Sequence, residues 1–151
     1  MHMSRHDSPF TLESVFGILR DEGLRITRKR TAILETLFES DSPMSLQEIQ
    51  QGAAQRAGTT PDFATVFRML NLMEQLHLVH KVSLQRSSSY YELSDPRKHY
   101  DHLICKKCNQ VILIDIPCPI GDTEKKLARQ YGFRDLSHSL EFFGICPTCA
   151  T

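Results

Sequence analysis

Four cysteines stand in two pairs with the same spacing, Cys105-Lys-Lys-Cys108 and Cys146-Pro-Thr-Cys149. A two-residue spacer lets one turn present both sulfurs of a pair, and four thiolates surround a zinc ion tetrahedrally at about 2.3 Å. In a cytoplasmic chain, cysteines bind metals more often than they form disulfides. The spacing therefore predicts one structural Zn2+ held by Cys105, Cys108, Cys146 and Cys149.

Two enzymatic interpretations of the cysteines do not fit. A redox dithiol needs a C-x-x-C that opens a helix after a strand, whereas the first pair is followed by VILID, a predicted strand. A zinc deaminase needs a His-x-Glu before its cysteine pair, and that triplet is absent from the sequence. We predict that the protein is not an enzyme and has no small-molecule substrate. Cys118, in IPCPIG, is interpreted as a small buried apolar side chain.

Further potential ligands flank the first cysteine pair. His99, Asp101 and His102 lie just before that pair, and His138 lies near the last predicted strand. His80 and Glu92 lie further upstream. His138 alternates with Leu140 and Phe142, which predicts that its side chain lies on the buried face of a strand. Mixed nitrogen and oxygen ligands suit a borderline divalent ion such as Zn2+, Fe2+ or Mn2+.

Composition bounds the remaining possibilities. The chain has 151 residues, 40% of them apolar, and its formal net charge is zero. No apolar run reaches the roughly 18 residues of a membrane span, and the first ten residues lack the apolar core of a secretory signal. We therefore expect a cytoplasmic protein without a membrane partner. The only dense basic run is Arg25, Arg28, Lys29 and Arg30.

The first eighty residues are predicted to form four short helices. Apolar residues recur at helical spacing in each, and the predicted N-caps are Thr27, Ser45 and Thr60. Ser45 with Glu48 forms a capping box, and Pro61 follows Thr60 at the first helical position. The fourth helix has a predicted apolar face made by Phe63, Val66, Phe67, Leu70 and Met73.

Two alternating segments, LVHKVSL and SYYELS, then predict a β-hairpin. Helices followed by a hairpin are the layout of a winged helix-turn-helix, whose last helix enters the major groove. Thr65 and Arg68 lie on the polar side of that helix, where they would contact DNA, and the basic run Arg25, Arg28, Lys29 and Arg30 would contact phosphates. The alternative is a capped helical bundle with a solvated basic face.

Three motifs resemble those of the ferric-uptake-regulator (Fur) family of bacterial metalloregulators. They are A-T-V-F-R-M-L-N at 64–71, H-x-D-H-L-I-C-x-x-C from His99, and S-H-S-L-E-x-F-G-x-C from Ser137. The resemblance extends from about Leu12 to Cys149. It implies a homodimer that binds double-stranded operator DNA and represses metal-homeostasis genes when a regulatory metal is bound. We therefore expect an α+β fold, with an N-terminal winged helix-turn-helix and a small α/β dimerisation domain carrying the four-cysteine zinc site.

The resemblance also implies a division of the chain and of its ligands. Residues 1–84 would form the DNA-binding domain, 85–98 the wing end and hinge, and 99–151 the dimerisation and metal-binding domain. The four cysteines match the structural zinc site of the family. His80, Glu92 and His102 match the sensing site at the hinge, whereas His99, Asp101 and His138 match a further site in the dimerisation domain.

The chain departs from the family pattern at several ligand positions. The loop histidine expected before the third helix is replaced by Ser42-Pro43-Met44. Leu113 replaces a hinge carboxylate, and Asp115 lies two residues further on. Gly121 replaces the helical glutamate of the dimerisation-domain site, with Asp122 and Glu124 nearby.

A further departure affects DNA contact. Phe67 replaces the usual tyrosine of the recognition helix, so a hydroxyl contact to DNA would be lost.

These departures bear on the metal that is sensed. The missing loop histidine disfavours the iron and peroxide sensors, and LVHKV resembles the zinc-uptake regulators. We expect a zinc-responsive repressor, with Zn2+ favoured over Fe2+ as the second, regulatory metal. An iron-responsive repressor of the same fold is the alternative. A non-regulatory zinc-ribbon scaffold is a third possibility, and it would show no metal-dependent DNA binding.

Overall fold

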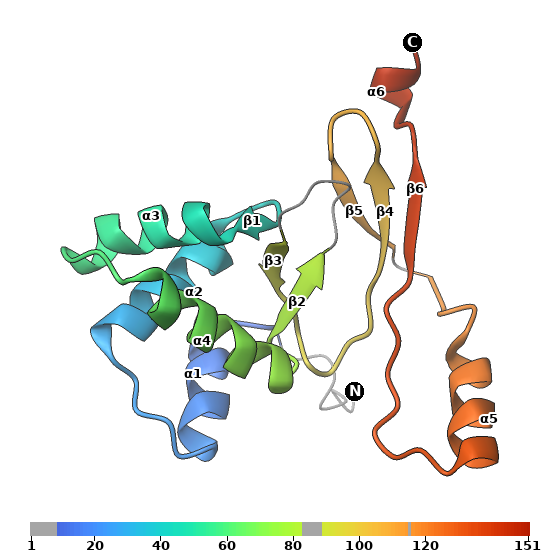
Figure 1. Cartoon of the computed structure of the whole chain (residues 1–151), viewed down its shortest axis with the longest axis horizontal. Coiled ribbons are helices and arrows are strands. Elements are labelled where there is room, and N and C mark those ends of the chain that lie inside the picture. Colours follow the sequence, from blue (N-terminus) through green and yellow to red (C-terminus); the bar gives the residue numbers. More distant parts are fainter. Residues whose placement is uncertain (1–8, 83–88, 115) are drawn as a thin grey trace, which may run out of the picture. The chain divides into compact units, whose positions relative to one another are not determined.

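The computed structural model describes residues 9–82, 89–114 and 116–151 and divides the chain into two compact units, Met1–Lys98 and His99–Thr151 (Figure 1). The turn of the predicted hairpin, at residues 83–88, and Asp115 lie outside the described residues. Among the described residues, no helix is both long and apolar enough to cross a membrane.

Four helices form most of the N-terminal unit: α1 (Leu12–Asp21), α2 (Arg28–Glu39), α3 (Leu46–Ala57) and α4 (Phe63–Gln75). Their apolar faces meet in a shared core that includes Val15, Leu19, Ile33, Leu34, Ile49, Val66, Leu70 and Met73. Thr27 and Ser45 cap α2 and α3 as predicted, and the reciprocal bonds between Ser45 and Glu48 are both formed. The caps satisfy backbone N–H groups that have no partner inside the helix.

The sequence prediction for α4 was wrong in two respects. The N-cap is Asp62 rather than Thr60, because the Asp62 carboxylate accepts the Thr65 N–H at 2.7 Å, and the helix therefore begins at Phe63. Phe63 and Phe67 are also not part of the buried face, since 49% and 48% of their surfaces are exposed. The core-facing stripe of α4 is narrower than the run of apolar residues in its sequence.

A three-stranded sheet completes the winged helix-turn-helix. β2 (Val79–Val82) and β3 (Tyr90–Leu93) pair antiparallel as the predicted hairpin strands, and the short β1 (Met44–Ser45) adds to the other edge of β3. The register places His80 directly opposite Glu92. Cross-strand partners share one face of the sheet, so these two side chains are neighbours.

The C-terminal unit contains a second three-stranded sheet and two helices: β4 (Asp101–Cys105), β5 (Val111–Ile114), α5 (Gly121–Tyr131), β6 (Glu141–Gly144) and α6 (Pro147–Ala150). The strand order is β5-β4-β6, with β4 antiparallel to β5 and parallel to β6. β6 begins at Glu141, so the predicted strand positions of His138 and Leu140 were wrong, and Phe142 is 45% exposed rather than buried. The predicted α+β fold class is confirmed.

One glycine in α3 marks a close approach between helices. A Cβ at Gly52 would overlap Cγ2 of Thr36 on α2 and lie 3.2 Å from its Oγ1. Thr36 is buried, and its hydroxyl donates to the Ala32 carbonyl at 2.7 Å, which limits its freedom to move. Glycine is unfavourable inside a helix, so its presence here reflects the packing of α2 against α3.

We predict that Gly52→Ala lowers the free energy of unfolding, although alanine is the better helix former. Overpacking costs about 1–3 kcal/mol, which exceeds or offsets the ~1 kcal/mol gain in helix propensity. Gly17→Ala in α1, where a new Cβ meets nothing within 4 Å, should instead raise stability by about 0.5–1 kcal/mol. Urea denaturation followed by circular dichroism measures both effects.

A second substitution tests the cause. Thr36→Ser removes Cγ2 but keeps the hydroxyl, so it should restore much of the stability lost in Gly52→Ala. Equal, stabilising effects of Gly52→Ala and Gly17→Ala would contradict this account of the contact.

Candidate metal centres and nucleic-acid interface

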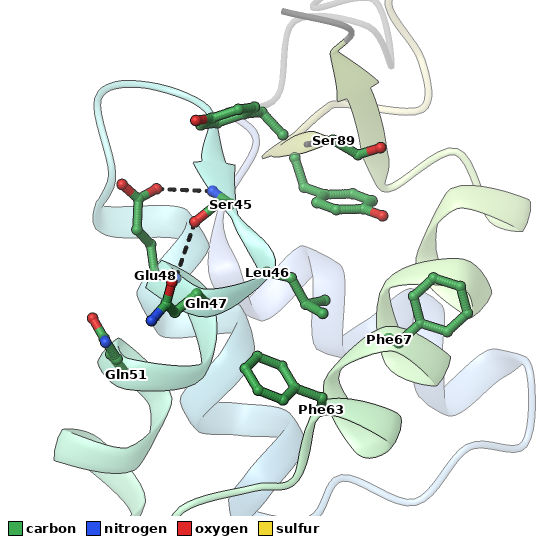
Figure 2. A pocket seen from close by; sticks show the side chains of 10 residues that line it. Ser45, Leu46, Gln47, Glu48, Gln51, Phe63, Phe67 and Ser89 are labelled. Atoms are coloured by element: carbon green, nitrogen blue, oxygen red, sulfur yellow. Dashed lines mark hydrogen bonds between the residues drawn. The ribbon is translucent and has the colours of Figure 1, made fainter. Parts of the chain in front are cut away.

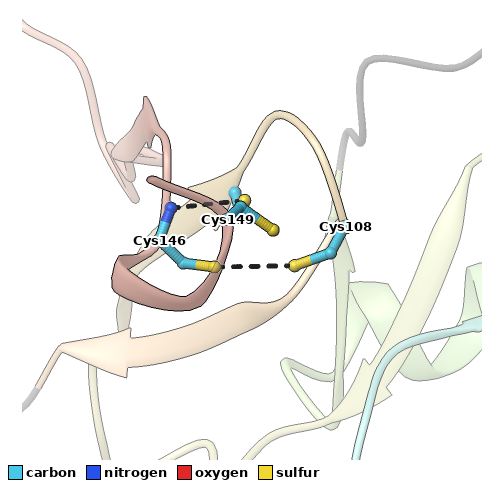
Figure 3. A group of neighbouring side chains, drawn as sticks. Cys108, Cys146 and Cys149 are labelled. Carbon is cyan, nitrogen blue, oxygen red and sulfur yellow. Dashed lines mark hydrogen bonds between the residues drawn. The ribbon is translucent and has the colours of Figure 1, made fainter. Parts of the chain in front are cut away.

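The four paired cysteines converge at one end of the C-terminal sheet. Cys105 ends β4 and Cys108 lies in the turn that follows, while Cys146 caps α6 and Cys149 lies within it. The four sulfurs all lie within 4.8 Å of one another, and Figure 3 shows the Cys108 and Cys146 sulfurs facing each other at 3.8 Å. Four sulfurs bound to one tetrahedral zinc ion at about 2.3 Å are separated by about 3.8 Å. The arrangement is that of a four-cysteine zinc site.

Backbone amides prepare this cluster to hold negative charge. The amides of Cys108 and Cys146 donate to the Cys105 sulfur, the latter at 3.3 Å, and they lower the pKa of Cys105 to about 6. The neighbouring side chains of Cys146 and Cys108 raise the pKa of Cys149 to about 12, because a thiol there donates to the sulfurs around it. A divalent metal favours the thiolate form of the cysteines that bind it.

A second cluster lies in the same unit. His99, Asp101 and His138, which the resemblance assigns to one site, are brought together, and the cluster also contains Cys118. His99 Nε2 lies 2.8 Å from Asp101 Oδ1, and the His99 and His138 ring centroids are 4.5 Å apart. The Asp101 side chain is only 2% exposed, and a carboxylate buried to that extent needs a counter-charge.

One member of this cluster, Cys118, differs from the sequence prediction, and one nearby acidic residue, Glu124, contacts the cluster. Cys118 was interpreted as a buried apolar side chain, but it is half-buried, and its sulfur lies 3.1 Å from His138 Nε2. Glu124 on α5 contacts the other ring nitrogen, Nδ1, of His138. Sequence reasoning missed Cys118, although the replacement of the helical glutamate by Gly121 could have indicated that another nearby ligand is present.

The remaining predicted ligands lie elsewhere. His80 and Glu92 are half-buried and face each other across β2 and β3 in the N-terminal unit. His102 is fully buried on β4, and since it alternates with Asp101 it points to the opposite face from the His99 cluster. Asp122 is exposed on α5.

A basic hollow lies beside α4 in the N-terminal unit. Its lining includes Arg25, Lys29 and Arg30 from the start of α2 together with Thr65 and Arg68 from α4. Arg28 does not line it; its guanidinium lies toward Gly58, at the end of α3. The structure therefore brings five of the six predicted DNA-binding residues together, on a surface that suits a phosphate backbone.

The N-terminal cap of α4, Asp62, contacts Thr65, which lines this hollow. The Thr65 hydroxyl and N–H hold the pKa of Asp62 below its ordinary value, and the charges of Arg68 and Lys29 lower it further. Thr65 is thus oriented by the helix cap, while Arg68 is exposed and extends from the next turn.

A second hollow flanks the other side of α4 (Figure 2). Phe63 and Phe67 project into it from α4, opposite Leu46 and Gln51 of α3 and beside Tyr90 of β3. At 100° per residue, Phe63 and Phe67 lie on one flank of the helix and Thr65 and Arg68 on the other. α4 therefore stands between two hollows, and the exposed phenyl groups could contact thymine methyl groups.

Comparison with known proteins shows which family has these sequence features. Residues 21–143 match the profile of the ferric uptake regulator family. The chain belongs to that family.

Individual relatives are similar to this chain over most of its length. The ferric uptake regulation protein of Campylobacter upsaliensis is 35% identical, with 99% of this chain and 95% of the relative covered. That of Legionella pneumophila is 34% identical, with 87% and 95% covered. The solved structure of the Helicobacter pylori ferric uptake regulator superposes with a TM-score of 0.69 at 25% identity, covering 94% of this chain and 95% of the other.

Members of the ferric uptake regulator family are DNA-binding regulators rather than enzymes, and this chain is accordingly a metal-responsive transcriptional regulator. The similarity to structures of the family extends over both units, and the four-cysteine cluster is consistent with a zinc site.

We predict that Cys105→Ser or Cys146→Ser unfolds the C-terminal unit. Each sulfur is part of the four-cysteine cluster, and in a structural zinc site the metal-binding free energy, about 10 kcal/mol or more, is folding free energy. Zinc content by mass spectrometry and circular dichroism test the loss. Cys118→Ser is the matched control, since it removes a thiol from outside the cluster and should keep this zinc ion. A folded Cys105→Ser variant without zinc would contradict the structural role.

For DNA, Arg68→Ala should cost about 1–3 kcal/mol of operator binding if the guanidinium contacts a base edge. Lys29→Ala should weaken operator and random DNA alike and reduce the slope of affinity against salt, as loss of a phosphate contact does. Lys126→Ala, an exposed lysine on α5, is the control for loss of one charge. Fluorescence anisotropy over a salt series measures all three variants. Unchanged binding by Arg68→Ala would remove it from the interface.

Proposed function

We propose that this protein is an iron-responsive repressor that binds operator DNA as a homodimer and controls metal-uptake genes. The observation that carries the proposal is the basic hollow beside α4, which places Arg25, Lys29, Arg30 and Arg68 around the recognition helix of a metal-binding family member.

The DNA-binding part of the proposal follows from α4 and its surroundings. α3 packs against α4, and α4 carries Arg68, which is exposed and lines the basic hollow. In a winged helix-turn-helix this helix enters the major groove while flanking cations contact phosphates. The formal net charge of zero does not oppose this, because the cations are concentrated at one place.

The apolar surface of the C-terminal unit supports a homodimer. Leu103 on β4 pairs with Ile112 on β5 and Phe142 on β6, and this row across the sheet is 43–45% exposed. Among the described residues of this unit, the buried apolar side chains are Ile104 and Cys105 alone. A unit of fewer than about 60 residues with so little core needs metal or a partner to be stable. A second copy would cover the row and align two recognition helices with two half-sites.

The N-terminal unit offers part of a metal-sensing site. His80 and Glu92 are adjacent across the wing strands, and we infer that they hold the sensing metal. A metal there favours the DNA-binding arrangement only by its difference in affinity between arrangements, typically about 1–3 kcal/mol of coupling.

Iron is proposed as the sensed metal because of the relatives. The proteins of Campylobacter upsaliensis and Legionella pneumophila are both named ferric uptake regulation proteins. The zinc response expected from the sequence is the second candidate, and the observation that favours it is Ser42-Pro43-Met44 in place of a loop histidine. The Helicobacter pylori regulator has three functional metal binding sites, and this chain holds ligand sets for a four-cysteine site, a His99 cluster and a His80–Glu92 pair.

The test is a titration of operator DNA in metal buffers. Protein carrying only the structural zinc should bind operator weakly, and Fe2+ under anaerobic conditions should restore binding at a lower free concentration than Mn2+. His80→Ala should keep the dimer and the structural zinc but lose metal-dependent binding. Free-metal control is essential, because zinc outranks Fe2+ at almost any nitrogen and oxygen site.

The controls separate the alternatives. His77→Asn changes an exposed histidine just beyond α4, at a left-handed backbone position that asparagine tolerates, and should leave the response unchanged. Activation by Zn2+ at the free-zinc level of a cell, without activation by Fe2+ at the free-iron level of a cell, would favour the zinc-responsive candidate. Full operator binding with only the structural zinc loaded would remove metal sensing from the function.

A further inference from the structure

We infer that Cys118 is a thiolate ligand of the second metal site, which makes that site a centre of two histidines, one aspartate and one cysteine that is selective for zinc over iron or manganese. The inference goes beyond the function proposed above, because it depends neither on the sensed metal nor on DNA binding. It assigns to Cys118 a role opposite to the buried apolar one predicted from the sequence.

The geometry of the cluster fits four ligands. One ligand atom from each of His99, Asp101, Cys118 and His138 lies within 4.8 Å of all the others. Ligands about 2.0–2.3 Å from a common tetrahedral zinc ion are separated by about 3.3–3.8 Å. The observed pairs, 2.8 Å between His99 and Asp101 and 3.1 Å between Cys118 and His138, are slightly closer, so a small outward shift would admit the ion.

The two nitrogens of His138 have different roles in this arrangement. Nε2 faces the Cys118 sulfur, and Nδ1 contacts the Glu124 carboxylate. A metal-binding histidine commonly donates its other N–H to a carboxylate, which fixes its orientation and tautomer. Glu124 is therefore a positioning residue for His138, and Cys118 lies on the metal side of the ring.

The local backbone explains how Cys118 reaches the site. The Gly121 N–H donates to the Cys118 carbonyl at 3.4 Å, which turns the chain into α5. A Cβ at position 121 would lie 4.0 Å from the Cys118 Cβ. The thiol thus stands next to the position from which the family's helical glutamate is missing, and it can supply an anionic ligand in place of that carboxylate.

Charge balance supports the same ligand set. Asp101 is almost fully buried, and a thiolate at Cys118 adds a second negative charge, while His99 and His138 are neutral as ligands. One divalent cation neutralises this set. A thiolate favours zinc over the harder Mn2+ and Fe2+, which compete better for an all nitrogen and oxygen site.

Cobalt substitution tests the inference directly. The four-cysteine site is first filled with zinc, and Co2+ is then titrated to saturation under reducing, anaerobic conditions. We expect a near-ultraviolet sulfur-to-cobalt charge-transfer band, which only a thiolate outside the four-cysteine site can produce. A zinc-release assay during the titration shows that cobalt has not displaced the structural zinc.

Three variants provide matched controls. Cys118→Ser should lose the band, and Cys118→Asp should bind cobalt without the band and discriminate less between zinc and Mn2+. Glu124→Gln should keep the band but weaken affinity about 10–100-fold, as loss of a positioning carboxylate does.

Several outcomes would overturn the assignment. They are wild-type protein that shows no band when saturated with cobalt, a band that persists in Cys118→Ser, and failure to bind any metal beyond the structural zinc. The first measurement uses the unaltered protein, so it is decisive even if a variant does not fold. Operator binding that is independent of iron would refute the proposed function while leaving this band, and thus this inference, intact.

Discussion

The four-cysteine cluster lies in a unit that has almost no apolar core among its described residues. Ile104 and Cys105 are the only buried apolar side chains among its described residues, and full burial of one such aliphatic side chain contributes about 1.5–3 kcal/mol. A structural zinc ion contributes about 10 kcal/mol or more. A structural zinc ion that joined β4 to α6 through the four sulfurs would therefore contribute more than the burial of these two side chains.

The N-terminal unit is stabilised in the opposite way. Its core gathers buried side chains from all four helices and from the sheet, and the two predicted caps on α2 and α3 are formed. α4 is thus held by apolar packing within its own unit and not by the four-cysteine cluster. A regulator built in this way can change its DNA affinity through the arrangement of its parts, without unfolding the surface that contacts DNA.

Sequence reasoning predicted the features that depend on local rules. Helical periodicity, the Ser45–Glu48 box and the cysteine spacing are local, and each appears in the structure. The errors arose where distant residues decide. Phe63 and Phe67 are apolar but lie beyond the edge of the core, and Cys118 obtains its surroundings from His138, twenty residues away in the sequence. The first residue of α4 depends on whether Thr60 or Asp62 caps the helix, and Asp62 does so by accepting the Thr65 N–H. The site assignments, by contrast, remain predictions.

The parallel pairing of β4 with β6 has a consequence for biosynthesis. Cys105 and Cys146 are 41 residues apart, so at about 5–20 residues per second the ribosome needs roughly 2–8 s to produce the second pair after the first. During that interval the N-terminal unit can already fold, whereas Cys105 and Cys108 form only half a zinc site. Newly made chains therefore pass through a state in which only two of the four clustered cysteines have been synthesised.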